Sequence, residues 1–69
     1  MSFNKGDRII VVKLDTEDAY LVGLSGKFEC YDIHTGWCEV LLDDIPKGSG
    51  HPESLGNRAF FREQALKPI

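Results

Sequence analysis

Cysteine is scarce in this 69-residue sequence, long apolar runs are absent, and acidic residues outnumber basic ones only slightly. Cys30 and Cys38 are too few for the dense disulfide framework of small secreted domains, so we expect reduced thiols. No apolar segment approaches the roughly 20 residues that a membrane-spanning helix needs, and the first residues form neither a basic nor a signal-like hydrophobic start. These features predict a cytoplasmic protein that does not bind membranes.

The length and composition indicate one small folded domain over residues 1–69. Hydrophobic residues make up 42% of the sequence and are spread along it, which argues against intrinsic disorder. A chain this short buries only roughly 60% of its unfolded surface, so an internal active-site cavity has little room. We therefore expect function at the surface of a monomer or small homo-oligomer. The net charge of −3 favours a protein partner over nucleic acid.

Turn residues divide the chain into short apolar segments, which is typical of an all-β barrel. Strands are expected at residues 8–14, 24–31, 37–42, 58–61 and 66–69, with a single helical turn at 62–65. Gly23 and Gly26 would let the second strand bend or bulge. Residues 43–57 are rich in Gly, Pro, Ser and Asp and show no hydrophobic period, so they are expected to form one long loop.

The segment DIHTG at residues 32–36 has the Asp and Gly of a short hairpin loop. If Tyr31 faces Trp37 across this loop, then Cys30 faces Cys38 and Glu29 faces Glu39. Alternation of side chains then predicts one core face and one opposite face for the hairpin. The expected core face comprises Phe28, Cys30, Cys38, Val40 and Leu42, and the opposite face comprises Tyr31, Trp37 and Leu41.

The two ends of the chain carry a family resemblance. Residues 5–12 (KGDRIIVV) and 60–69 (FFREQALKPI) resemble small SH3-like barrel proteins of bacteria and their phages, including KOW-type modules. Residues 2–7 (SFNKGD) also resemble the diverging turn of eukaryotic SH3 domains. The resemblance implies a five-stranded SH3-like barrel, a phage or prophage origin and a host protein as target. Because the chain lacks the Ala-Leu-Tyr-Asp-Tyr and Pro-x-x-Tyr segments of peptide-binding SH3 domains, recognition of proline-rich peptides is not implied.

Aromatic residues near the expected loops are the first candidates for a protein-binding surface. Tyr20, Tyr31 and Trp37 are amphipathic side chains of the kind that anchor interfaces. The other candidates are the acidic residues of the loop before Tyr20, namely Asp15, Glu17 and Asp18. Such clustered charge would steer the domain toward a basic partner, although it also suits a solvated loop. A structural alternative stays open for Trp37, which could cover an open end of the barrel.

A second candidate surface is basic, and it would support a KOW-like module that binds nucleic acid or acts beside the transcription or translation machinery. Its residues are Arg58, Phe60, Arg62 and Lys67. Proteins that bind single-stranded nucleic acid use basic side chains to contact the backbone and exposed aromatic rings to stack on the bases. Because Phe60 and Phe61 are adjacent, alternation leaves only one of them outside the core. The alternative is that these charges keep edge strands soluble.

Cysteine and histidine residues support two weaker hypotheses, a zinc site and a reactive thiol. Cys30, His34 and Cys38 are spaced evenly around the hairpin, and His51 in the long loop could complete a zinc site. Cys38, His34 and Asp32 also have the residue types of an activated thiol. Neither spacing is a standard motif, and two core cysteines with a solvated turn histidine explain the same residues. We therefore expect no metal, no cofactor and no catalytic activity, and the sequence favours a non-enzymatic binding module.

Overall fold

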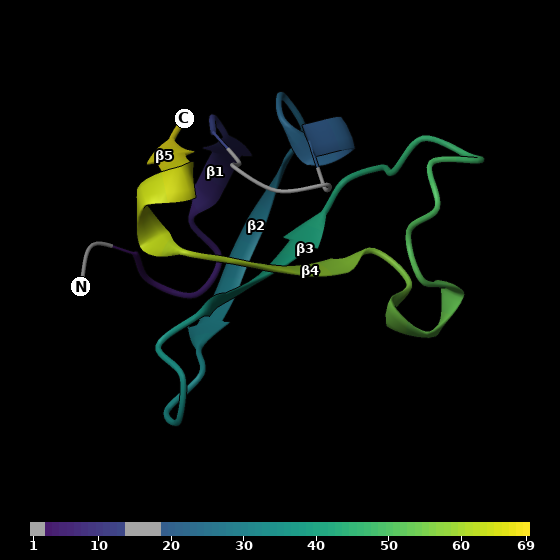
Figure 1. Cartoon of the computed structure of the whole chain (residues 1–69). Coiled ribbons are helices and arrows are strands. Elements are labelled where there is room, and N and C mark those ends of the chain that lie inside the picture. Colours follow the sequence, from purple (N-terminus) through teal and green to yellow (C-terminus); the bar gives the residue numbers. More distant parts are fainter. Residues whose placement is uncertain (1–2, 14–18) are drawn as a thin grey trace.

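The computed structural model describes residues 3–13 and 19–69 (Figure 1). Within these ranges five strands form one antiparallel sheet in the order β4-β3-β2-β1-β5. The strands are β1 (Arg8–Val11), β2 (Ser25–Tyr31), β3 (Cys38–Leu42), β4 (Arg58–Phe61) and β5 (Leu66–Pro68). Short 3-10 helices in the connections are η1 (Ala19–Leu21), η2 (Glu53–Leu55) and η3 (Glu63–Ala65). The predicted all-β class and the helical turn before the last strand are confirmed.

The sheet is open rather than closed by backbone pairing. β4 and β5 lie at the two ends of the strand order, and no ladder joins them in the described part of the chain. β1 ends at Val11, three residues before the predicted end at position 14, which lies outside the described residues. One further backbone bond, from Val12 N to Ala65 O at 2.8 Å, reaches η3. The ladder ends there because the chain opposite turns into a helix.

The core covers one face of the sheet. Every second residue is buried along β3 and β4, as the two-residue period of a strand requires. The buried residues are Phe3, Ile9, Val11, Leu21, Phe28, Cys38, Val40, Leu42, Ala59, Phe61, Ala65 and Leu66. Phe61 is buried and Phe60 is exposed, so the predicted division of this aromatic pair is confirmed. Tyr20, Leu24, Tyr31 and Ile45 pack half-buried against this core.

A β-bulge between Phe28 and Cys30 overturns the predicted hairpin register. Tyr31 pairs with Cys38 and Cys30 pairs with Glu39, where the sequence predicted Trp37 and Cys38 as the respective partners. The bulge inserts one extra residue, so every side chain after it on β2 changes face. Cys30 is therefore exposed and was wrongly assigned to the core. Tyr31 turns inward instead, and its ring centroid lies 4.7 Å from that of Phe28.

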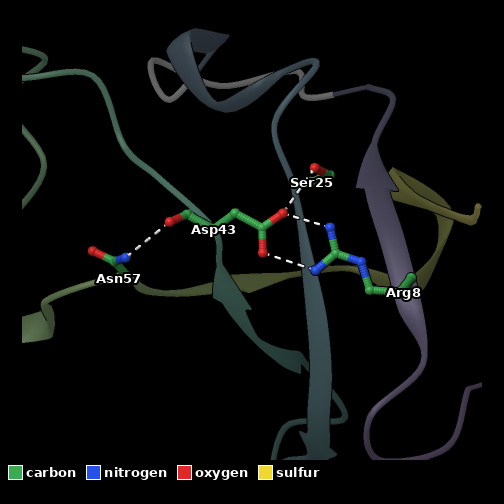
Figure 2. A network of polar contacts seen from close by, with 4 residues as sticks. All are labelled: Arg8, Ser25, Asp43 and Asn57. Atoms are coloured by element: carbon green, nitrogen blue, oxygen red, sulfur yellow. Dashed lines mark hydrogen bonds and ion pairs between the residues drawn. The ribbon is translucent and has the colours of Figure 1, made fainter.

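Gly26 and an ion pair fix the contact between β1, β2 and the end of β3. A Cβ atom on Gly26 would lie 2.3 Å from the Leu41 carbonyl oxygen, so this buried position requires glycine. The sequence had suggested that Gly26 permits a bulge, whereas the bulge lies further along β2. Arg8 reaches across the sheet end and donates two hydrogen bonds to the Asp43 carboxylate (Figure 2). Ser25 Oγ donates to the same carboxylate at 3.2 Å.

The long connection between β3 and β4 extends beyond the sheet (Figure 1), yet it is tied to it. Ile45 packs against the core, and η2 interrupts the segment that was expected to be without regular structure. His51 Nε2 donates to the carbonyl oxygen of Arg58 at 2.9 Å. The hydroxyl of Tyr20 and Nδ1 of His51 form a second hydrogen bond at 2.9 Å. The loop is thereby joined to η1 and to β4.

Candidate partner-binding face

The face of the sheet opposite the core carries a group of aromatic, aliphatic and basic side chains. Alternation along the strands places the residues on it, because their chain neighbours Cys38, Val40, Ala59 and Phe61 are buried. We call this surface the outer face. Its residues are Lys27 and Cys30 from β2, Trp37, Glu39 and Leu41 at and before β3, and Arg58, Phe60 and Arg62 at and after β4.

Trp37 and Arg62 form one end of the outer face. The Arg62 guanidinium carbon lies 4.6 Å from the centroid of the Trp37 ring, which is a cation–π contact. The register explains the contact: Cys38 pairs with Phe61, so the residues just beyond this pair lie opposite each other. Trp37 is half-buried, and it keeps part of its ring accessible beside a fixed positive charge. This combination can hold an apolar or acidic group of a partner.

Phe60 and Leu41 supply exposed apolar surface in the middle of the outer face. Their exposed fractions are 41% and 40%. Phe60 pairs with Glu39 and Leu41 pairs with Arg58, so the two apolar side chains are diagonal neighbours on adjacent strands. The contacts available there are those of an aromatic anchor next to an aliphatic one.

The outer face is locally basic although the whole chain is acidic. Lys27, Arg58 and Arg62 bring three positive charges, while Glu39 brings one negative charge from the paired strands. The whole sequence has a net charge of −3. Charge on this face therefore favours an acidic partner, because association is steered by the local field of a binding surface.

The structure separates the three predicted aromatic anchors. Tyr20 lies in η1, packs against the core and bonds to His51. Tyr31 also packs against the core, donates its hydroxyl proton to Glu63 Oε2 at 2.8 Å and accepts from the Phe3 amide at 3.1 Å. Of the three, only Trp37 is on the outer face. The predicted acidic candidates at positions 15, 17 and 18 lie outside the described residues.

The predicted basic candidates are brought together in part. Arg58, Phe60 and Arg62 follow one another on the outer side of β4. Lys67 lies on β5, at the opposite end of the strand order. The sequence therefore found Trp37, Arg58, Phe60 and Arg62 but assigned them to two different surfaces. It placed Leu41 opposite the core without assigning it to a binding surface, and it did not select Lys27. Only the register across β2, β3 and β4 shows that both residues belong to this face.

The cysteine and histidine candidates are not brought together. Cys30 is exposed and Cys38 is buried, so the two thiols lie on opposite faces of the sheet. Burial raises the pKa of the Cys38 thiol above its ordinary value, and the nearby Glu63 carboxylate raises it further. Asp32 Oδ1 accepts a hydrogen bond from the backbone amide of His34 at 2.7 Å, and this bond stabilises the turn between β2 and β3. Within the described residues no three His, Cys, Asp or Glu side chains are placed to hold a metal ion.

Two surface hollows lie away from the outer face. One, of about 380 Å³, is lined by the long loop from Ile45 to Asn57. The other, also about 380 Å³, is lined by Phe3, Glu63, Gln64, Leu66 and Pro68. Both hollows are open at the surface.

Comparisons with protein-family models, curated proteins and solved structures find no match to this chain. The described residues also contain no helix long and apolar enough to cross a membrane.

Proposed function

We propose that this chain is a non-enzymatic binding module of the SH3-like barrel type, and that it binds another protein through the outer face. The order of the strands, the long loop and the helical turn before the last strand support the SH3-like assignment. The resemblance of the chain ends supports a module of the bacterial cytoplasm that is encoded by a phage or prophage and directed at a host protein.

One observation carries the proposal: Phe60 and Leu41 are exposed as diagonal neighbours on the outer face, and Arg58 and Arg62 lie on either side of Phe60 along its strand. Aromatic and arginine side chains are the residues most enriched at protein interfaces. Phe60 is also held on a strand, so little conformational entropy is lost when a partner covers it. A rigid aromatic centre with charged neighbours matches the composition of a protein-binding surface.

The nucleic-acid alternative is weaker on this geometry. Arg62 covers one face of the Trp37 ring, which reduces the surface on which a base could stack. Glu39 pairs directly with Phe60 and would lie near the phosphates of a stacked strand. Lys67, the fourth residue of the predicted basic set, is on β5, which lies at the other end of the strand order from β4. A protein partner with acidic groups fits the face better.

The test is affinity capture from bacterial lysate by the tagged chain, with and without nuclease, followed by mass spectrometry. Phe60→Ala removes the central anchor, and Val22→Ala is the matched control because Val22 is 43% exposed elsewhere on the molecule. We expect a stoichiometric protein that survives nuclease, is retained by the Val22 variant and is lost with the Phe60 variant. Loss of every partner on nuclease treatment would favour nucleic acid, and equal capture by both variants would exclude the outer face.

A further inference from the structure

The free edge of β4 has a defined pattern of backbone groups. Leu42 N donates to Asn57 O at 2.8 Å, and the ladder then continues without a bulge from the Leu41–Arg58 pair to the Cys38–Phe61 pair. In an antiparallel ladder the backbone groups of successive residues point alternately toward and away from the partner strand. The amide and carbonyl of Arg58 and Phe60 therefore point away from β3. The bond from His51 to the Arg58 carbonyl, on that side, agrees with this assignment.

One residue of this edge remains available for pairing. The Arg58 carbonyl is capped by His51, and Arg62 O accepts from Ala65 N at 3.0 Å in η3. Across the described part of the chain, the outward amide and carbonyl of Phe60 form no hydrogen bond. An unpaired donor and acceptor on an edge strand are the groups to which an added strand binds. Phe60 is also the exposed aromatic residue that β4 contributes to the outer face.

Charge determines which strand this edge accepts. Arg58 and Arg62 flank Phe60 symmetrically at two-residue spacing, and all three side chains are on the outer face. If a second copy paired antiparallel about Phe60, Arg58 of one copy would lie opposite Arg62 of the other. Like charges directly opposite each other are destabilising, so the flanking arginines disfavour self-pairing. The same two arginines stabilise a strand that has acidic residues at both flanking positions.

We propose that β4 binds an extended segment of the partner protein by β-strand addition, with an apolar residue opposite Phe60 and an acidic residue on each side of it at two-residue spacing. This inference rests on the proposed protein-binding function and specifies the class of segment bound. The added strand exchanges two backbone hydrogen bonds with Phe60. Its acidic side chains contact Arg58 and Arg62, and its central apolar side chain covers the Phe60 ring.

The probe is an acetylated and amidated synthetic peptide with the core Glu-Thr-Val-Thr-Glu, added to the ¹⁵N-labelled full chain. Two matched peptides are the charge-reversed Lys-Thr-Val-Thr-Lys and the acidic peptide with an N-methylated valine. At ten times its Kd the acidic peptide should slow exchange of the Phe60 amide about tenfold. The lysine peptide should bind about fivefold more weakly or worse, because two cross-strand pairs are lost. N-methylation should abolish the slowing, since it removes the donor to the Phe60 carbonyl.

The double variant Arg58→Glu with Arg62→Glu should reverse the preference between the acidic and lysine peptides. Binding that leaves exchange of the Phe60 amide unchanged would overturn strand addition, as would no binding by the acidic peptide at millimolar concentration. A dimer of the free chain that protects this amide would show that a second copy occupies the edge, which also overturns the proposal. Strand addition fails in each of these outcomes. If the Phe60→Ala substitution nevertheless abolishes capture of the protein from lysate, the proposed binding function stands. If capture is also unaffected, both fail.

Discussion

Tyr31 donates its hydroxyl proton to Glu63 Oε2 at 2.8 Å, and this bond joins β2 to η3. The bond exists because the bulge turns Tyr31 toward the core side of the sheet. The hydroxyl oxygen of Tyr31 also accepts a hydrogen bond from the Phe3 amide. Tyr31 therefore joins β2 to η3 and to the segment before β1. Tyr31 therefore has a structural role, whereas its sequence had suggested an interface anchor.

Tyr31→Phe should lower the free energy of unfolding by about 1–2 kcal/mol, because a hydrogen bond to a carboxylate and one to an amide are both lost in a half-buried site. Urea unfolding followed by circular dichroism measures the change. Ile33→Ala is the control, since Ile33 is 91% exposed at the hairpin turn and its loss should change stability by less than about 0.5 kcal/mol. An unchanged unfolding midpoint for the phenylalanine variant would contradict the structural role.

The contact between Trp37 and Arg62 should appear as a coupling energy. A double-mutant cycle with Trp37→Leu and Arg62→Ala should give about 0.5–1 kcal/mol, the range of exposed cation–π pairs. Urea unfolding of the four proteins measures it. A parallel cycle with Trp37→Leu and Arg58→Ala should be additive, because Arg58 lies opposite Leu41 instead. Additivity in the first cycle would mean that the two side chains do not interact in solution.

Asp43 should retain its charge in acid. The hydrogen bonds from Arg8 lower the pKa of Asp43 to about 2, and Ser25 contributes in the same direction. The carboxylate therefore adds stability above its unfolded pKa of about 3.9, and this contribution is lost as the pH falls toward 2. An NMR titration of the carboxyl carbons measures the pKa directly.

Arg8→Leu should return the Asp43 midpoint toward its ordinary value, and Asp43→Asn should flatten the dependence of stability on pH between 4 and 2. Asp44→Asn is the matched control, since that neighbouring side chain is exposed and outside the network of Figure 2. A normal midpoint for Asp43 in the unmodified chain would show that the ion pair does not form in solution.

The two thiols should differ sharply in reactivity. Cys30 is exposed, whereas Cys38 is buried and has a raised pKa, and only the thiolate reacts. A chromogenic disulfide reagent near neutral pH should therefore label one thiol per folded chain and two in urea. Cys30→Ser should abolish labelling of the folded protein. Rapid labelling of Cys38 in the folded chain would contradict the assigned burial and would restore the reactive-thiol interpretation.

Gly26→Ala should be among the most damaging single substitutions. Its Cβ would meet the Leu41 backbone, which can move only if β2 and β3 separate. We expect a loss of about 2–4 kcal/mol, as for other severe overpacking of a close contact. Lys27→Ala, at the next residue and exposed, should change stability by less than about 0.5 kcal/mol. Thermal unfolding of both variants is the measurement.

The outer face was only half predictable, because its residues come from three strands whose relative register the sequence pattern does not specify. Alternation within 58–61 correctly separated Phe60 from Phe61, and the same period placed Leu41 opposite the core. The sequence did not place Trp37 against Arg62, since their contact depends on which residue of β3 pairs with which residue of β4. The free amide of Phe60 likewise follows from the strand order and from His51, neither of which is local.

The sequence by itself determined where the strands lie, because the two-residue period, the turn residues and the β-branched segments are local properties of the chain. It did not determine the bulge that inserts one residue before Cys30, and that single residue exchanged the positions of Cys30 and Tyr31 between solvent and core. The tertiary structure decided this register because packing of the Tyr31 ring on Phe28 and its bond to Glu63 involve segments far apart in sequence. Local pattern cannot encode such contacts, since their energy depends on the whole sheet.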